Sequence, residues 1–287
     1  MSSQSSPSAA VLITGCSSGI GRATALRLAR RGHTVYASAR RAESIADLER
    51  SGCRVLALDV TDEASMAGAV RAVETEHGAV GALVNNAGYS QSGAVESVPL
   101  DVVRRQFETN VFGLVRMCQL VLPAMRAQRA GRIVNVSSMG ANFTFPGGGL
   151  YHATKYAVEA ISDALRFEVQ GFGVRVAIVQ PGLIRTNFGD AAAAAVGDAE
   201  AEGPYGGFNA MVARATQDVY TKGAARHLGG PPEAVAKAIE RAITSTSPRI
   251  RYRVTPSARV LIAQRALMTD GMWDRFVATR FPRPGAR

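Results

Sequence analysis

The chain has 287 residues, of which 47% are hydrophobic and 29 are glycine. This length allows a large hydrophobic core, and one α/β domain over residues 1–287 is the simplest organisation. No apolar run approaches the roughly 18 residues of a membrane-spanning helix, and residues 1–10 lack the charged start and apolar stretch of a signal peptide. Three scattered cysteines exclude a disulfide framework or a metal cluster, so we expect reduced thiols and a cytoplasmic protein.

The formal net charge of +10 raises the question of a nucleic-acid or anionic-membrane partner. A binder of that kind needs its basic side chains clustered on one face. The arginines are instead spread along the chain without a long basic block, although the C-terminal end is enriched in them. We therefore expect neither a nucleic-acid partner nor a membrane span. The four histidines have no metal-ligand spacing, so we also expect no metal site.

Strand-like apolar runs alternate with helix-period segments, which is the pattern of a parallel sheet covered on both faces. We expect strands at residues 9–13, 34–38, 54–58, 82–85, 132–137, 174–179 and 251–254. Helices are expected at residues 20–31, 63–77, 102–129 and 155–170. The Ser-rich residues 1–8 should form a disordered tail, and residues 281–287 should fray. The predicted fold is a single Rossmann-type, doubly wound α/β sheet of about seven strands.

A glycine-rich segment follows the first expected strand and opens the first helix. It reads Gly15-Cys16-Ser17-Ser18-Gly19-Ile20-Gly21. Glycine allows a sharp turn and close approach of the backbone to a pyrophosphate, while the helix N-terminus offers N–H groups to the anion. A plain strand-to-helix turn is the alternative. The strand before the segment and the helix after it favour a dinucleotide site.

The end of the second strand distinguishes NADP from NAD. An acidic side chain there would accept hydrogen bonds from the ribose hydroxyls of NAD, but the sequence carries Arg40 and no carboxylate. Arg40 could bind a 2′-phosphate through charge-assisted bonds, supplemented by Ser18. The alternative is a solvated surface arginine. We predict NADP(H) as the cofactor.

Polar residues also follow the third and fourth strands. Asp59, followed by Val60, could hold the adenine amino group, or it could cap the following helix through Thr61 and Asp62. The segment Asn85-Asn86-Ala87-Gly88 could bond a neighbouring loop or the cofactor, or could be a turn made for local reasons.

Tyr151 and Lys155 lie four residues apart, with Ser138 upstream. On a helix this spacing places both side chains on one face, about 5–6 Å apart at Cβ. A phenol, with a usual pKa of about 10, is a poor proton donor at neutral pH unless a fixed cation lies nearby. A core tyrosine beside a solvated lysine is the alternative for this pair alone. The other motifs favour a catalytic pair.

Taken together, residues 14–21 and 85–88, Asn110, Ser138, Tyr151 and Lys155, and Pro181-Gly182 with Thr186 resemble the short-chain dehydrogenase/reductase family over nearly the whole chain. Residues 13–19, 35–40 and 248–253 look most like its 17β-hydroxysteroid-dehydrogenase-like branch. The family's cofactor residues would then correspond to Gly15, Ser17, Ser18, Gly19, Ile20, Gly21, Arg40, Asp59, Val60, Asn86, Ala87, Gly88, Tyr151, Lys155, Pro181, Gly182, Ile184 and Thr186.

The resemblance also implies a role for each catalytic residue. Tyr151 would be the general acid or base, and Lys155 would hold the nicotinamide ribose and lower the pKa of the phenol. Ser138, rather than Ser137, would fix the substrate oxygen. Asn110 would interrupt its helix and hold a water that relays protons to Lys155; a satisfied polar residue inside a helix is the alternative. Thr186 would bond the nicotinamide carboxamide.

Residues 187–230 should form a mobile helical lid over the substrate, because this stretch is rich in Gly and Ala with few large side chains. We expect the substrate to contact Phe143, Phe145, Leu183, Phe188, Tyr205, Phe208 and Met211. These side chains favour a medium-to-large apolar ketone or secondary alcohol, steroid-like or otherwise lipophilic. The resemblance further implies a homodimer or homotetramer. A non-catalytic NADP-binding sensor or scaffold protein is the alternative function.

Overall fold

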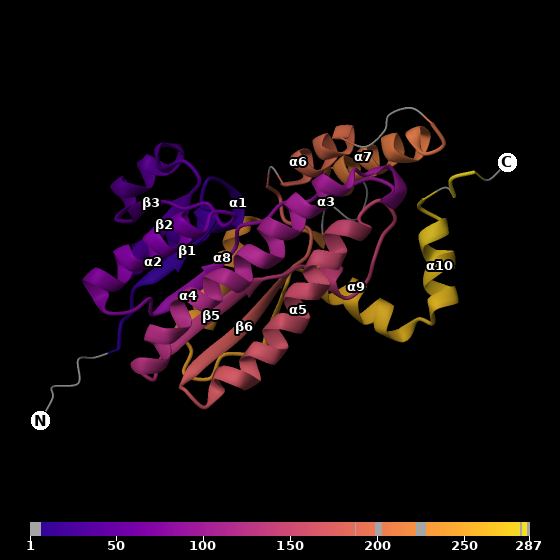
Figure 1. Cartoon of the computed structure of the whole chain (residues 1–287). Helices are drawn as coiled ribbons and strands as arrows, with labels where there is room; N and C mark the ends of the chain where they lie inside the picture. Colours follow the sequence, from indigo (N-terminus) through magenta and orange to yellow (C-terminus); the bar gives the residue numbers. More distant parts are fainter. Residues whose placement is uncertain (1–6, 187, 199–202, 222–227, 282, 286–287) are drawn as a thin grey trace, which may run out of the picture.

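The computed structural model describes residues 7–186, 188–198, 203–221, 228–281 and 283–285. Seven parallel strands form one sheet in the order β3-β2-β1-β4-β5-β6-β7 (Figure 1). This confirms the predicted Rossmann-type α/β sheet. The chain reverses direction across the sheet between β1 and β4, and such a reversal opens a crevice at the carboxyl ends of the strands. The strands are β1 (Val11–Ile13), β2 (Val35–Ala39), β3 (Arg54–Ala57), β4 (Ala82–Asn85), β5 (Gly131–Val136), β6 (Val174–Pro181) and β7 (Arg251–Val254).

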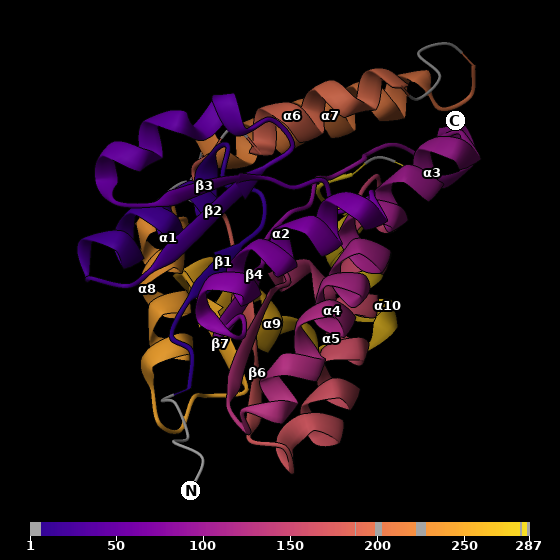
Figure 2. The same ribbon diagram turned by 60° about the vertical axis from the view of Figure 1, so that its left-hand side comes forward.

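Helices cover both faces of the sheet (Figure 2). α1 (Gly19–Arg30) and α8 (Pro232–Thr244) pack together on one face, and their core side chains include Leu28 and Ile239. The other face is covered by α2 (Glu63–His77), α4 (Gly113–Ala127) and α5 (Gly149–Gln170). The sheet therefore lies between two apolar layers, and polar groups at its carboxyl edge are available for a site.

The long helix expected at residues 102–129 is interrupted. It consists of α3 (Leu100–Phe107), a π-helical segment η3 (Glu108–Phe112) and α4. Asn110 lies within η3, so the interruption that the resemblance implied is present. Single π-turns of this kind often occur at functional sites.

Several elements were not predicted from the sequence. Besides α8, they are the short helical segments η1 (Ala42–Ser51), η2 (Val95–Ser97) and η4 (Met139–Ala141), and two C-terminal helices, α9 (Pro256–Leu267) and α10 (Asp270–Ala278). α5 also begins six residues earlier than expected. Tyr151 therefore lies on the same helix as Lys155, as the four-residue spacing argument requires.

The expected lid contains α6 (Phe188–Ala194), η5 (Ala195–Asp198) and α7 (Gly206–Thr221), and α6 and α7 lie together across one end of the molecule (Figure 1). The described part of this span is therefore mostly helical. Residues 187, 199–202 and 222–227 of this span lie outside the described residues, and mobility of the lid stays a prediction.

Both predicted tails are shorter than expected: the N-terminal one ends earlier, and the C-terminal one begins later. The backbone N–H of Ser8 donates to Oε1 of Gln128 at 2.9 Å, so Ser8 is fixed on the protein and the disordered-tail assignment is wrong for it. Phe281 donates its N–H to Val277 and stacks on Phe145 with ring centroids 6.0 Å apart, so fraying does not start there. Residues 1–6, 282 and 286–287 lie outside the described residues. None of the described helices combines the length and apolar character needed to cross a membrane.

Candidate active site

A cavity of about 1650 Å³ opens at the carboxyl ends of the strands. Its wall is formed by residues that directly follow β1 to β6, and it continues between α7, α9 and α10. Nearly all the residues predicted to bind the cofactor line this cavity: Gly15, Ser17, Ser18, Gly19, Ile20, Arg40, Asp59, Val60, Asn86, Ala87, Gly88, Tyr151, Lys155, Pro181, Gly182, Ile184 and Thr186. Gly21 is buried and does not line the cavity.

The glycine loop is shaped for close approach. Gly15 and Gly19 adopt φ values of +73° and +56°, which favour glycine. A Cβ on Gly15 would lie 2.9 Å from the Cα of Ala87, and a Cβ on Gly21 would lie 2.3 Å from the carbonyl oxygen of Gly15. Ser18 precedes α1 without making a side-chain capping bond, and the first turn of α1 has no acidic residue. This end of the helix is therefore suited to an anionic group.

Asn86 holds the glycine loop in place. Its Nδ2 donates to the carbonyl oxygens of Thr14 and Gly15, each at 3.0 Å, and its backbone N–H donates to Oγ1 of Thr14 at 3.0 Å. The sequence left open a bond to a neighbouring loop, a bond to the cofactor and a purely local turn. The side chain of Asn86 makes the first of these.

Arg40 is exposed at the end of β2, on the cavity wall. It forms no ion pair with any residue in the described part of the chain. Its guanidinium can therefore bind an anionic ligand without first breaking an internal ion pair.

Asp59 lies near Arg40 along the cavity wall but has a local role as well. Its Oδ1 accepts from the N–H and the hydroxyl of Thr61 at 2.9 and 2.8 Å. The N-cap of α2 is Asp62, which accepts from the N–H of Ser65 at 2.9 Å, and not Asp59. Asp59 thus stabilises the turn before the helix and remains on the cavity wall, so adenine binding stays a prediction.

Lys155 is a buried cation next to the tyrosine. Its side chain is 6% exposed, its Nζ donates to the carbonyl oxygen of Val136 at 2.9 Å, and Nζ lies 5.9 Å from the centre of the Tyr151 ring. Burial lowers the pKa of Lys155 to about 8, and the charge of Glu159 partly opposes this shift. A positive charge is thus held beside a phenol that lines the cavity.

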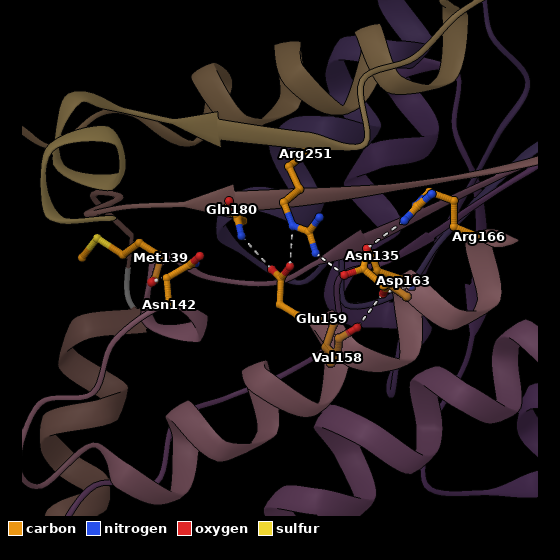
Figure 3. Close-up of polar contacts among 10 residues, drawn as sticks. Asn135, Met139, Asn142, Val158, Glu159, Asp163, Arg166, Gln180 and Arg251 are labelled. Carbon is orange, nitrogen blue, oxygen red and sulfur yellow. Dashed lines mark hydrogen bonds and ion pairs between the residues drawn. The ribbon is translucent and has the colours of Figure 1, made fainter. Parts of the chain in front are cut away.

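Past Lys155 along α5, side chains of opposite charge form a chain, and Figure 3 shows its members Glu159, Asp163, Arg166 and Arg251. Glu159, one helical turn further along α5, accepts from Nε2 of Gln180 at 3.0 Å and from Nε of Arg251 at 2.9 Å. Arg251 also bonds Asp163 at 2.5 Å, and Arg166 lies 3.3 Å from the same carboxylate. The network ties α5 to β6 and β7 and fixes the helix that carries Tyr151 and Lys155. The sequence reasoning did not find it.

Ser138 lies on the cavity wall at the start of η4, where its Oγ accepts from the N–H of Gly140 at 3.1 Å. The Nδ1 of His152 lies 2.6 Å from the carbonyl oxygen of Gly140, so Nδ1 carries the proton of this bond. Burial lowers the pKa of His152, which favours its neutral form. His152 therefore supports the turn that presents Ser138. The hydroxyl of Ser137 is buried with no hydrogen-bond partner among the described residues.

Asn110 is buried, and Gly88 lies close to both Asn110 and Lys155. Its Oδ1 accepts from the N–H of Tyr89 at 3.0 Å, and its Nδ2 donates to the carbonyl oxygen of Tyr89 at 2.9 Å and to Oγ1 of Thr154 at 3.1 Å. A Cβ on Gly88 would lie 3.0 Å from Oδ1 of Asn110 and 3.7 Å from Nζ of Lys155. The side chain is thus satisfied by protein groups, as in the alternative interpretation, and the water relay stays a prediction.

The predicted substrate residues divide into two groups. Phe143, Phe145, Leu183 and Phe188 line the cavity, and the ring of Phe188 lies 5.7 Å from that of Tyr151. The sequence analysis missed three further aromatic side chains on the wall: Tyr89, which follows β4, and Phe276 and Phe281, which come from the C-terminal segment.

Tyr205, Phe208 and Met211 do not lie on the cavity wall. The hydroxyl of Tyr205 donates to Glu96 at 2.7 Å, away from the cavity. α7 is rotated so that another stripe, which includes Val212, Ala215 and Val219, faces the cavity. The i, i+3, i+7 spacing of that stripe explains why the sequence prediction, which chose large side chains without knowing the helix phase, named the wrong positions.

Comparison with known proteins agrees with this geometry. Residues 9–196 match the short chain dehydrogenase family. The chain is 44% identical over 181 residues to a 3-ketodihydrosphingosine reductase of Bacteroides thetaiotaomicron, a match that spans 63% of this chain and 65% of that reductase, slightly under two thirds. It is 33% identical to an NADPH-dependent 3-dehydrocapnine reductase of Ornithobacterium rhinotracheale, over 92% of this chain and 94% of the relative. A short-chain dehydrogenase from Streptomyces avermitilis has a similar structure, with a TM-score of 0.78 and 33% identity over 96% of this chain and 95% of that one.

Proposed function

We propose, from the premise that this chain belongs to the short-chain dehydrogenase family, that it transfers a hydride between NADP(H) and the carbonyl or secondary alcohol of a medium-to-large apolar substrate. The observation that carries this proposal is the position of Ser138, Tyr151 and Lys155 on one cavity that also contains the glycine loop.

The residues on the cavity wall fit a dinucleotide. The glycine loop packs so closely on Ala87 and Thr186 that Gly15 and Gly19 leave little space for a Cβ, and the start of α1 offers N–H groups to a pyrophosphate. Arg40 would hold the 2′-phosphate, and Lys155 would hold the nicotinamide ribose. NADP(H), when bound, supplies or accepts the hydride, while the protein provides placement and a proton.

Tyr151 would donate its proton to the carbonyl oxygen during reduction, or remove the hydroxyl proton during oxidation. Bringing a phenol pKa from about 10 toward 7 requires roughly 4 kcal/mol of stabilisation of the phenolate. A buried ammonium such as that of Lys155 supplies such stabilisation because the surroundings screen its charge weakly. Ser138 would hold the substrate oxygen at the same point.

The apolar wall supports a lipophilic substrate. Phe143, Phe145, Phe276 and Phe281 line the end of the cavity beyond Tyr151. The names of the two relatives describe reductases of a 3-keto and a 3-dehydro compound, which supports ketone reduction here. The 17β-hydroxysteroid-dehydrogenase-like branch, the mobile lid and a homodimer or homotetramer in the cytoplasm remain predictions.

The test is to mix the protein with NADPH or NADH and a panel of ketones of increasing apolar size, and to follow nicotinamide absorbance. We expect NADPH oxidation with medium-to-large ketones. Binding of NADPH without consumption by any carbonyl or alcohol would instead favour the sensor or scaffold alternative, and absence of NADP(H) binding would contradict both.

A further inference from the structure

The turn that follows β7 has an unusual backbone. Thr255 adopts φ +83° and ψ 153°, although its β-branched side chain disfavours positive φ. Pro256 follows it at the first position of α9, where its restricted φ suits a helix start. A residue held in such a strained conformation persists only where the surrounding structure requires it.

Two hydroxyl groups from this turn are packed against the loop after β6. Ser257 is 1% exposed, and its Oγ accepts from the N–H of Leu183 at 3.0 Å. The same Oγ lies 2.8 Å from Oγ1 of Thr255. A Cβ on Gly182 would lie 2.3 Å from each of these oxygens. The strained turn thus fills the space beside Gly182 with hydroxyl groups.

The loop is held from its other side as well. Gly230 donates its N–H to the carbonyl oxygen of Leu183 at 2.9 Å and accepts from the N–H of Arg185 at 3.0 Å. A Cβ on Gly230 would lie 3.0 Å from the methyl group of Thr255. Thr255 therefore packs close to both segments that fix the loop.

This loop carries the residues assigned to the nicotinamide end of the cofactor. Gly182, Ile184 and Thr186 line the cavity, as does Ser257 itself. Thr186 lies over the glycine loop, since a Cβ on Gly19 would be 3.2 Å from its methyl group. Ser257 accepts from the backbone N–H of Leu183 within this loop, so it helps to fix the position of the loop in the cavity wall.

We propose that Ser257, supported by Thr255, is a positioning residue that preorganises the loop of Gly182 to Thr186 for the nicotinamide half of the cofactor. The proposal rests on the proposed function. Its physical basis is that a loop fixed before binding loses less conformational entropy when the ligand arrives.

The experiment compares two ligands, NADPH and adenosine 2′,5′-bisphosphate, which carries the 2′-phosphate but no nicotinamide. Dissociation constants are measured by calorimetry for the unmutated protein, Ser257→Ala and Ser245→Ala. Ser245 is a matched control because its Oγ also accepts a backbone N–H, from Ser247, but outside the cavity. We expect Ser257→Ala to weaken NADPH binding about 5- to 10-fold, the effect of one lost hydrogen bond. Binding of the bisphosphate should be unchanged.

Thr255→Val provides a second variant in case Ser257→Ala does not fold, because it removes one hydroxyl and keeps the shape. It should show the same selective loss at a smaller size. Equal weakening of both ligands, or no weakening of either, would overturn the positioning role. If the unmutated protein binds neither ligand, both the proposed function and the positioning role of Ser257 fail. If the unmutated protein binds both ligands and Ser257→Ala binds them equally well, only the positioning role fails.

Discussion

The cofactor end and the substrate end of the cavity are built in different ways. At the cofactor end, most wall residues come from loops that follow the strands, and the side chain of Asn86 bonds the backbone of Gly15 in one of these loops. At the substrate end, aromatic rings from distant parts of the chain meet: Phe145 stacks on Trp273 and Phe281. The first end is fixed by the sheet, and the second depends on how the late helices pack. We therefore expect changes at the first end to affect chemistry and cofactor choice, and changes at the second to affect substrate choice.

The largest expected effect is on the chemical step. Tyr151→Phe should reduce kcat by at least 100-fold and leave NADPH affinity nearly unchanged, because the phenol proton is needed only when hydride is transferred. Steady-state kinetics and a binding titration measure the two quantities. Tyr156→Phe is the matched control, since Tyr156 lies on the same helix but outside the main cavity, and it should behave like the unmutated protein. More than a few per cent of residual activity in Tyr151→Phe would refute the assignment.

The second prediction concerns the stability cost of the buried cation. Because burial lowers the pKa of Lys155 from 10.5 to about 8, the folded state disfavours the charged form at every pH below 8. Between about pH 8 and pH 10.5 the unfolded chain binds more protons than the folded protein does. The free energy of unfolding of the unmutated protein therefore increases as the pH rises through that range. The difference in the pKa of Lys155 between the folded and unfolded states corresponds to at most about 3 kcal/mol in the free energy of unfolding.

Lys155→Met should therefore abolish activity and yet raise the free energy of unfolding at pH 7 by about 1–3 kcal/mol, less the lost bond to Val136. The gain should shrink toward pH 10. Urea unfolding at the two pH values measures it, with Lys237→Met, an exposed lysine on α8, as control. A destabilised Lys155→Met protein at pH 7 would show that the attraction of Glu159 outweighs the desolvation of the ammonium.

The contrast between the two ends of the cavity also explains which features the sequence predicted. The sheet was predicted correctly, and the glycine loop, Arg40, Tyr151 and Lys155 were placed on one cavity, because each signal is local: a strand followed by a short motif, or a four-residue helical spacing. The amphipathic pattern of α8, with Val235, Ile239 and Ala242 buried, was also local and was overlooked.

The contacts that were missed join distant residues. Glu159 and Arg251 are 92 positions apart, and Leu183 and Ser257 are 74 apart. No sequence pattern in one residue predicts its partner. The packing of α5 on the strands brings the first pair together, and the packing of α9 on the loop after β6 brings the second pair together. Phe208 and Met211 were assigned wrongly for a related reason, because side-chain size does not reveal which stripe of a helix faces a cavity.

The third prediction tests cofactor choice. Arg40→Ala should weaken the preference for NADPH over NADH by about 1–3 kcal/mol, because a charge-assisted bond to the 2′-phosphate is lost. The ratio of kcat/KM for the two cofactors measures it. Arg41→Ala is the control, as Arg41 is exposed but not part of the cavity wall. Equal efficiency of the unmutated protein with both cofactors would contradict the role of Arg40.

The smallest expected effect is at the substrate end. Phe281 lies on the cavity wall close to the end of the chain, so Phe281→Ala should alter the wall with little effect on the sheet. It should raise KM for bulky apolar ketones about 5-fold, or about 1 kcal/mol, and leave KM for small ketones unchanged, since only a large substrate reaches the missing ring. Phe208→Ala, which removes the same ring outside the wall, should change neither value. An equal rise in KM for small and bulky ketones would mean that the C-terminal segment supports the catalytic geometry as a whole, and the two ends of the cavity would then not be separable.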